Sequence, residues 1–138
     1  MTASAAALAM GLVAWRQRRS YLVVTVHGPS MWPTYSDGDR VLVRRVDVAA
    51  VRPDDVVVLA LHSAAITEAA ELIIKRVAAL PGDSVPDGIP VSERLVPPGQ
   101  LVVLGDNQYA SYDSRRAGYF DATTLVGVVV RAMSQALA

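Results

Sequence analysis

Six short runs of valine, leucine and isoleucine, separated by glycine, proline and aspartate, limit the folds open to this 138-residue chain. Branched aliphatic residues favour strands, and the turn formers keep the runs too short for long helices. The runs predict strands at residues 21–26, 40–45, 56–61, 72–77, 101–104 and 125–131. We therefore expect residues 20–138 to form one all-β domain, mainly antiparallel, as a β-sandwich or a distorted barrel. Residues 63–71 fit either a helical turn or a loop.

Residues 1–19 form a separate segment, in which an uncharged, alanine-rich stretch ends at Trp15 and three arginines follow. As a helix, residues 1–15 would be about 22 Å long, shorter than the roughly 30 Å hydrocarbon core of a bilayer. The segment predicts a short apolar helix that anchors the chain in a membrane. Three other interpretations stay open: a helix at the membrane surface, a disordered start, and the end of a longer span. A cleaved signal peptide is disfavoured, because the positive charges follow the apolar stretch.

Charge and cysteine content exclude several classes of function. The formal net charge is zero, which gives no indication of a nucleic-acid partner. The chain has no cysteine, which excludes disulfides, thiol catalysis and cysteine-based zinc sites. It also lacks a glycine-rich phosphate loop and a histidine cluster, so we expect neither a metal nor a cofactor.

A serine in a turn of glycine and proline is the first candidate for catalysis. Ser30 lies in the stretch HGPSMWPT at residues 27–34, directly after the first predicted strand. Such a turn lifts a hydroxyl out of a sheet and presents it to a cleft. On its own, this serine would be interpreted as an ordinary turn residue.

A single lysine is the second candidate. Lys75 is the only lysine in the chain, and every other basic residue is arginine or histidine. Arginine keeps its proton near neutral pH, whereas lysine loses it when desolvated. In a strand, Lys75 would share one face with Ile73 and Val77, and burial there would lower its pKa. A neutral lysine beside a serine hydroxyl is a general base, and the alternative is a surface lysine lying along a strand.

The third candidate is the stretch GDNQYASYDSRRAG at residues 105–118, which follows an apolar run. It combines small polar and turn-forming residues with an acid and arginines. This composition suits a loop that folds back on itself through side-chain hydrogen bonds. In a chain that also has Ser30 and Lys75, we interpret the loop as the wall that orients the base.

Taken in order, these stretches resemble the sequence boxes of the type I signal peptidase family. Residues 28–34 with 38–43 resemble the nucleophile box, 75–83 the lysine box, 105–118 the last box, and 51–57 a weaker box between the first two. Together they cover most of residues 22–131. The resemblance implies an antiparallel β-fold and a membrane-associated serine endopeptidase that cleaves signal or leader peptides from precursor proteins after small residues.

The resemblance also implies roles for single residues. Ser30 would be the nucleophile, and Lys75 its general base. The Ser30 backbone N–H would stabilise the oxyanion; some relatives add a hydroxyl two residues earlier, where this chain has Gly28. Ser111 would hydrogen-bond the lysine amine and orient it.

Four further positions carry weaker expectations. Asp113 and Arg115 would form a pair that braces the last box, and the alternative is a surface ion pair of little consequence for stability. Met31 and Trp32 follow the nucleophile, and the resemblance implies that they line the substrate cleft or meet the membrane. Core packing is the other interpretation of Trp32.

The chain resembles a small, minimal form of the family. Only residues 83–104 separate Gly82 from Gly105, where larger relatives insert an extra β domain. The resemblance implies a cell-membrane protein, single-pass or peripheral, with precursor proteins and lipid as partners and the catalytic domain outside the cytoplasm. The arginines after residues 1–15 favour the opposite orientation. The sequence leaves the natural substrate and the oligomeric state open.

Two other functions are alternatives to this one. A catalytically silent homologue could act as a binding or scaffold subunit, but the presence of both Ser30 and Lys75 argues against loss of activity. A self-cleaving repressor-type peptidase would also use a serine and a lysine. It would need a DNA-binding helical domain before the peptidase, and residues 1–20 are too short to form one.

Overall fold

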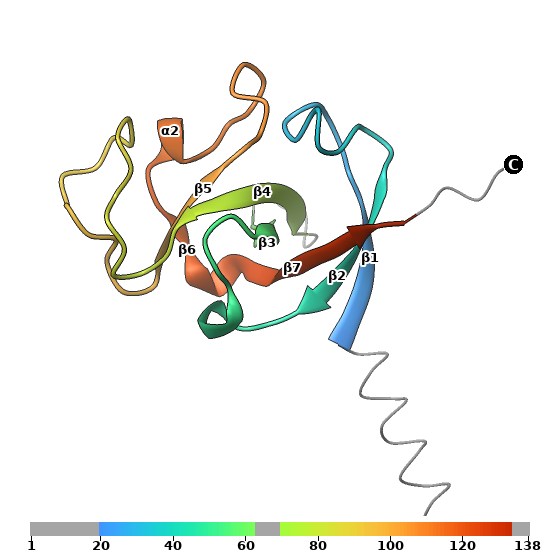
Figure 1. The fold of residues 1–138 in the computed structure, drawn as a ribbon, viewed down its shortest axis with the longest axis horizontal. Coiled ribbons are helices and arrows are strands. Elements are labelled where there is room, and N and C mark those ends of the chain that lie inside the picture. The colour runs from blue at the N-terminus through green and yellow to red at the C-terminus, as the bar shows by residue number, and fades with distance from the viewer. Residues whose placement is uncertain (1–19, 63–69, 134–138) are drawn as a thin grey trace, which may run out of the picture.

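The computed structural model describes residues 20–62 and 70–133, and its strands form one seven-stranded antiparallel sheet in the order β1-β2-β7-β3-β4-β5-β6 (Figure 1). The strands are β1 (Tyr21–Thr25), β2 (Arg40–Arg45), β3 (Val56–Leu61), β4 (Glu71–Ala79), β5 (Gln100–Leu104), β6 (Phe120–Asp121) and β7 (Leu125–Ala132). The short helical turns are η1 (Val48–Ala50), α2 (Ser114–Ala117) and η2 (Ala122–Thr124). The mainly antiparallel all-β prediction is confirmed.

The strand predictions match the bounds of β2 and β3, extend β1 by one residue, and omit end residues of β4, β5 and β7. β4 is longer than residues 72–77, because its first half pairs with β3 and its second half also pairs with β5. β6 has only two residues, Phe120 and Asp121, and was not predicted. A pair of residues is too short to give an alternating pattern in the sequence.

The central strand β3 is buried on both faces, which explains its unbroken apolar run. Val56 and Val58 pack on one face with residues of β1 and β2. Val57 and Leu59 pack on the other face with residues of β4 and β5. Two cores therefore lie on opposite faces of one sheet, and β4 borders both.

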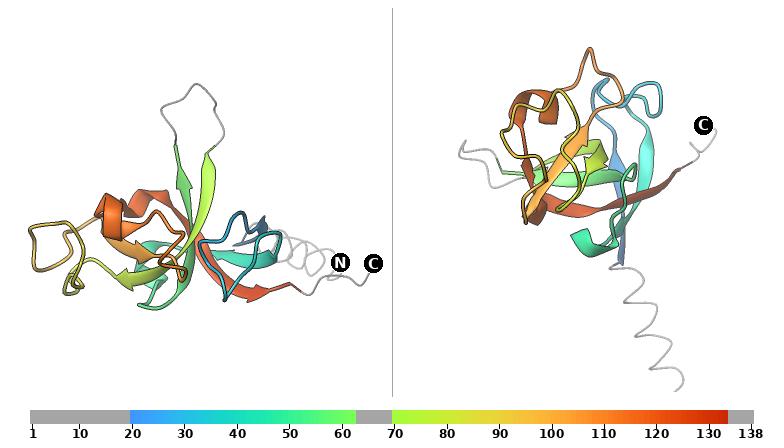
Figure 2. Two further views of the ribbon diagram at one scale, coloured as in Figure 1. Left: turned by 90° about the horizontal axis from the view of Figure 1, so that it is seen from above. Right: turned by 60° about the vertical axis from the view of Figure 1, so that its left-hand side comes forward.

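Two loops extend from the same end of the sheet. One follows β1 and holds residues 26–39, and the other follows β5 and holds residues 105–113 (Figures 1 and 2). This end of the sheet therefore brings the two polar boxes of the sequence together. A third cluster, which includes Ala79, Ile89, Val96 and Val102, packs the 81–99 loop against the other end of β4.

Two expectations from the sequence cannot be compared with the structure. The N-terminal helix and anchor at residues 1–19 lie outside the described residues, and so does most of the segment at 63–71. Within the part of the chain that is described, no helix combines the length and the apolar character needed to cross a bilayer.

Candidate active site

The turn that carries Ser30 is fixed at both ends. Val26 N donates to Asp39 O at 2.7 Å, and Gly38 N donates back to Val26 O at 2.8 Å. Gly28 has a φ of +78°, a conformation that glycine adopts without a steric cost, and its N–H donates to the Asp37 carboxylate at 2.7 Å. These bonds hold Ser30 in a half-buried turn at the edge of a cleft.

The side chain after Ser30 anchors the turn. Met31 is fully buried and packs in the core with Val24, Val41 and Val43. Trp32 is 58% exposed, and neither Met31 nor Trp32 is among the residues that line the cleft. The structure therefore places Met31 in the core and Trp32 at the surface, away from the cleft wall expected from the sequence. The backbone turn at Met31 is closed by Tyr35 N, which donates to Met31 O at 2.9 Å, and the Met31 side chain points inward because it packs against apolar residues of β1 and β2.

The backbone N–H of Ser30 is a free donor within the described residues. The neighbouring bonds in the turn run from Trp32 N to Pro29 O and from Tyr35 N to Met31 O. No described residue accepts a hydrogen bond from Ser30 N, although its carbonyl is engaged. A free backbone N–H beside a serine hydroxyl is of the kind that can stabilise a developing oxyanion.

Lys75 lies on β4 and is only 5% exposed. It is directly opposite Val57 in the β3–β4 pairing, so its stem lies among aliphatic side chains. Burial lowers the pKa of the Lys75 amine; the Asp113 carboxylate opposes this shift, and the Arg115 guanidinium adds to it. The Nζ donates to Ser111 Oγ at 3.1 Å.

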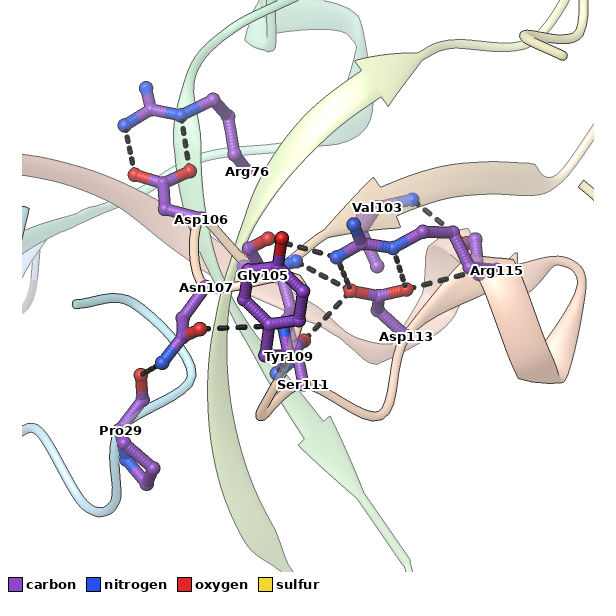
Figure 3. A network of polar contacts seen from close by, with 12 residues as sticks. Pro29, Arg76, Val103, Gly105, Asp106, Asn107, Tyr109, Ser111, Asp113 and Arg115 are labelled. Carbon is purple, nitrogen blue, oxygen red and sulfur yellow. Dashed lines mark hydrogen bonds and ion pairs between the residues drawn. The ribbon is translucent and has the colours of Figure 1, made fainter. Parts of the chain in front are cut away.

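Ser111 connects Lys75 to the ion pair of Asp113 and Arg115. Figure 3 shows Ser111, Asp113 and Arg115 in this network. Ser111 Oγ donates to Asp113 Oδ2 at 2.7 Å, and Asp113 also accepts from Gly105 N at 2.8 Å. Arg115 completes the set, with its Nη2 at 2.6 Å from Asp113 Oδ2. Burial alone would raise the pKa of Asp113, but the hydrogen bonds from Arg115, Gly105 and Ser111 hold it well below its usual range.

The ionised state of Asp113 determines what Ser111 offers to the lysine. A serine hydroxyl has one proton to donate, and here Asp113 accepts it. Ser111 Oγ therefore faces Lys75 as an acceptor, and one lysine N–H is used in that bond. The lone pair of a neutral Lys75 amine is left to accept a proton from another group.

Gly105 is the point at which the two halves of the site meet. A Cβ on this residue would come within 2.7 Å of Ser30 O, and it would also overlap the Ser111 side chain. Only glycine therefore fits between the Ser30 turn and Ser111, which accepts the hydrogen bond from Lys75. Asn107 adds two bonds to the turn, from its N to Ser30 O at 2.9 Å and from its Nδ2 to Pro29 O at 3.1 Å.

A second ion pair, which the sequence did not predict, joins Arg76 of β4 to Asp106 of the 105–113 loop. Arg76 donates to Asp106 through Nε at 2.9 Å and Nη2 at 2.7 Å (Figure 3). The Thr34 hydroxyl also donates to Asp106. The hydrogen bond from Arg76 lowers the pKa of Asp106, burial opposes this, and Thr34 adds to it. Thr34 and Asp106 are 72 positions apart, so no local pattern in the sequence indicated this contact.

Ser30 and Lys75 line one cleft of about 290 Å³. The other lining residues are Thr25, Val26, His27, Leu61, Glu71, Leu72, Ile73, Ile74, Tyr112 and Phe120. No hydrogen bond joins the Ser30 and Lys75 side chains in the structure as described, and catalytic contacts of this kind often tighten only when substrate binds. The cleft walls come from four separate strands, β1, β3, β4 and β6, and from the loops after β1 and β5, so no local pattern in the sequence indicates them.

Comparison with known proteins gives a consistent set of similarities. A family model described as signal peptidase, peptidase S26, matches residues 1–86 and 87–133. Signal peptidase I of Bacillus caldolyticus is 28% identical over 141 aligned residues, which cover 75% of this chain and 74% of that protein. A probable signal peptidase I-1 of Synechocystis sp. is 30% identical over 124 residues, which cover 71% of this chain and 63% of that protein.

Proposed function

Because the chain belongs to the peptidase S26 family of signal peptidases, we propose that it is a serine endopeptidase in which Ser30 is the nucleophile and Lys75 the general base. Its substrates are precursor proteins or peptides with a signal or leader sequence. The observation that carries the proposal is the connection through Gly105. The Ser30 turn packs against Gly105, Gly105 packs against Ser111, and Ser111 accepts a hydrogen bond from the buried lysine.

The reaction proceeds in two stages. Neutral Lys75 takes the proton of the Ser30 hydroxyl as the oxygen attacks the carbonyl carbon of the scissile peptide bond. The Ser30 backbone N–H donates to the oxyanion that forms. The protonated lysine then gives its proton to the leaving amine, and the precursor is split with its signal part esterified to Ser30. Water, activated by the neutral lysine, hydrolyses this ester and restores both residues.

Ser111, Asp113 and Arg115 are positioning residues, which orient the Lys75 amine. Arg115 and Gly105 keep Asp113 ionised, Asp113 holds the Ser111 proton, and Ser111 then accepts from Lys75. The amine is thus oriented without being protonated. Burial of its stem beside Val57 lowers the pKa of the Lys75 amine and so favours the neutral form that acts as the base.

The cleft suits an extended polypeptide. β5 pairs with β4 only from Arg76 onward, so, among the described residues, the same edge of β4 is without a strand partner over residues 71–75. A substrate strand lies along this edge, with Thr25, Val26 and His27 on its other side. The preference for small residues at the cut follows from the family, and the modest volume of the cleft is compatible with it.

The membrane is the proposed site of action. The apolar stretch at residues 1–15 and the arginines after it would hold the chain at the bilayer, as a single-pass or peripheral protein. The peptidase domain would face the extracytoplasmic side, where signal peptides emerge.

The function is tested with the full chain in detergent and a purified precursor that has small residues one and three positions before the cut. We expect one cleavage, located by N-terminal sequencing of the product, directly after the small residue. A second precursor with phenylalanine at the last position before the cut should be cleaved far more slowly. Equal rates for the two precursors, or cleavage at scattered positions, would contradict a signal-peptidase specificity.

Activity is expected to rise with pH as Lys75 loses its proton. Only the neutral amine is a base, so kcat/KM increases through the pKa of Lys75 and then levels off. Burial lowers that pKa, so the midpoint of the rise should lie below the value of about 10.4 for free lysine. Because the chain has one lysine, selective labelling at the lysine Cε gives a single NMR signal. Its titration midpoint should match the kinetic one; an ordinary lysine midpoint would contradict the proposed base.

A further inference from the structure

The cleft contains the carboxylate of Glu71, which has no part in the chemistry described above. Glu71 begins β4, and it is the only acidic residue among those that line the cleft in the described structure. It lies four positions before Lys75 on the same strand, so both side chains are on one face. At about 3.3 Å per residue, the two positions are about 13 Å apart along the strand.

The Glu71 carboxylate is available to a ligand. Within residues 20–62 and 70–133, no hydrogen bond or ion pair engages it, and the residue opposite it in the β3–β4 pairing is the apolar Leu61. Glutamate is also an unfavourable choice for a strand position. The two acidic residues in the networks described above differ, because Asp106 and Asp113 are each paired with an arginine.

We propose that Glu71 makes the enzyme prefer precursors with a lysine or arginine about four residues from the cleaved bond, on the side of the cut that lies along the first residues of β4. The inference rests on the proposed function. An extended substrate advances along the open β4 edge at the same rise per residue as β4 itself. The substrate residue opposite Glu71 is therefore four positions from the one opposite Lys75.

The size of the preference follows from the exposure of the site. Glu71 is an exposed residue at the cleft rim, so water and salt screen its charge. Exposed ion pairs of this kind change a rate or an affinity by at most about fivefold. An acid in the same substrate position would be disfavoured by a similar factor, and both effects should weaken at high salt.

The test uses the full chain in detergent and two series of precursors. Each has small residues at the cut and a single Arg, Gln or Glu, placed four residues upstream in one series and four downstream in the other. kcat/KM is measured for the wild type, Glu71→Gln, Glu71→Lys and the control Asp87→Asn. Asp87 is an exposed acid in the 81–99 loop and does not line the cleft, so its variant matches the change in net charge.

We expect the wild type to prefer Arg over Glu in one of the two series, with Gln between them. Glu71→Gln should remove the preference, Glu71→Lys should reverse it, and Asp87→Asn should keep it. Equal rates for Arg and Glu in both series, or a preference that survives Glu71→Lys, would overturn the inference and leave the proposed function intact. No cleavage of any precursor by the wild type, the Gln series included, would overturn the proposed function and this inference with it.

Discussion

Replacing Lys75 with arginine is expected to abolish precursor cleavage, with a loss of at least about 1,000-fold in kcat/KM. Arginine does not lose its proton in the range where the enzyme works, so no base remains to activate Ser30. The larger guanidinium also does not fit the position of a side chain that is 5% exposed. The initial rate of product formation, measured with the precursor of small residues, gives the loss directly.

Two further variants separate loss of the base from loss of the fold. Lys75→Met keeps an unbranched chain of similar length and removes the buried amine, so its melting temperature should equal or exceed that of the wild type while its activity is lost. Arg94→Lys changes an exposed basic residue outside the cleft and should leave both properties unchanged. His27 lines the same cleft, so His27→Ala tests the other nitrogen base. Full activity in Lys75→Arg, with loss in His27→Ala, would show that the histidine is the base.

Replacing Asp113 with asparagine is expected to lower the free energy of unfolding by about 2–4 kcal/mol. Asp113 is fully buried and accepts hydrogen bonds from Gly105, Ser111 and Arg115. The neutral amide leaves Arg115 without its counter-charge and one of the buried donors without an acceptor. This loss of stability is smaller than that expected for a completely buried ion pair, because the Arg115 side chain is 31% exposed and keeps part of its hydration.

The same variant should change how stability depends on pH. The pKa of Asp113 is lower in the folded protein than in the unfolded chain, so its contribution is present above about pH 4 and is lost as the pH falls further. Urea unfolding at pH 7 and pH 3 should therefore show a smaller drop for Asp113→Asn than for the wild type. Asp121→Asn is the matched control, since asparagine caps the η2 turn about as well as aspartate does. Equal stability of Asp113→Asn and Asp121→Asn at pH 7 would contradict a buried role for Asp113.

Much of the fold could be predicted from the sequence, because most strands have an apolar pattern that is visible within the strand itself. The run at Val56–Leu61 is apolar throughout, and the structure explains this by burial on both faces of β3. β6 gave no such signal, because Phe120 and Asp121 form a strand only through their pairing with Gln100 and Leu101. The length of β4 likewise depends on two different partners.

Only part of the candidate site could be predicted from the sequence. The lone lysine and the glycine-proline turn are local signals that indicate Lys75 and Ser30, and the resemblance added Ser111, Asp113 and Arg115. The direction of a side chain in a turn is set by packing, so the sequence did not reveal that Met31 enters the core. The cleft walls and the Thr34–Asp106–Arg76 contact join segments far apart in the chain, and no local pattern encodes them.

The central claim is that Ser30 performs the cleavage, and the rate of precursor cleavage by the wild type and by Ser30→Ala tests it most directly. We expect the wild type to release the mature product and Ser30→Ala to be at least about 1,000-fold slower, with an unchanged melting temperature. Equal rates for the two proteins would contradict the claim. Cleavage by neither would contradict it as well, and would favour a binding role for the cleft.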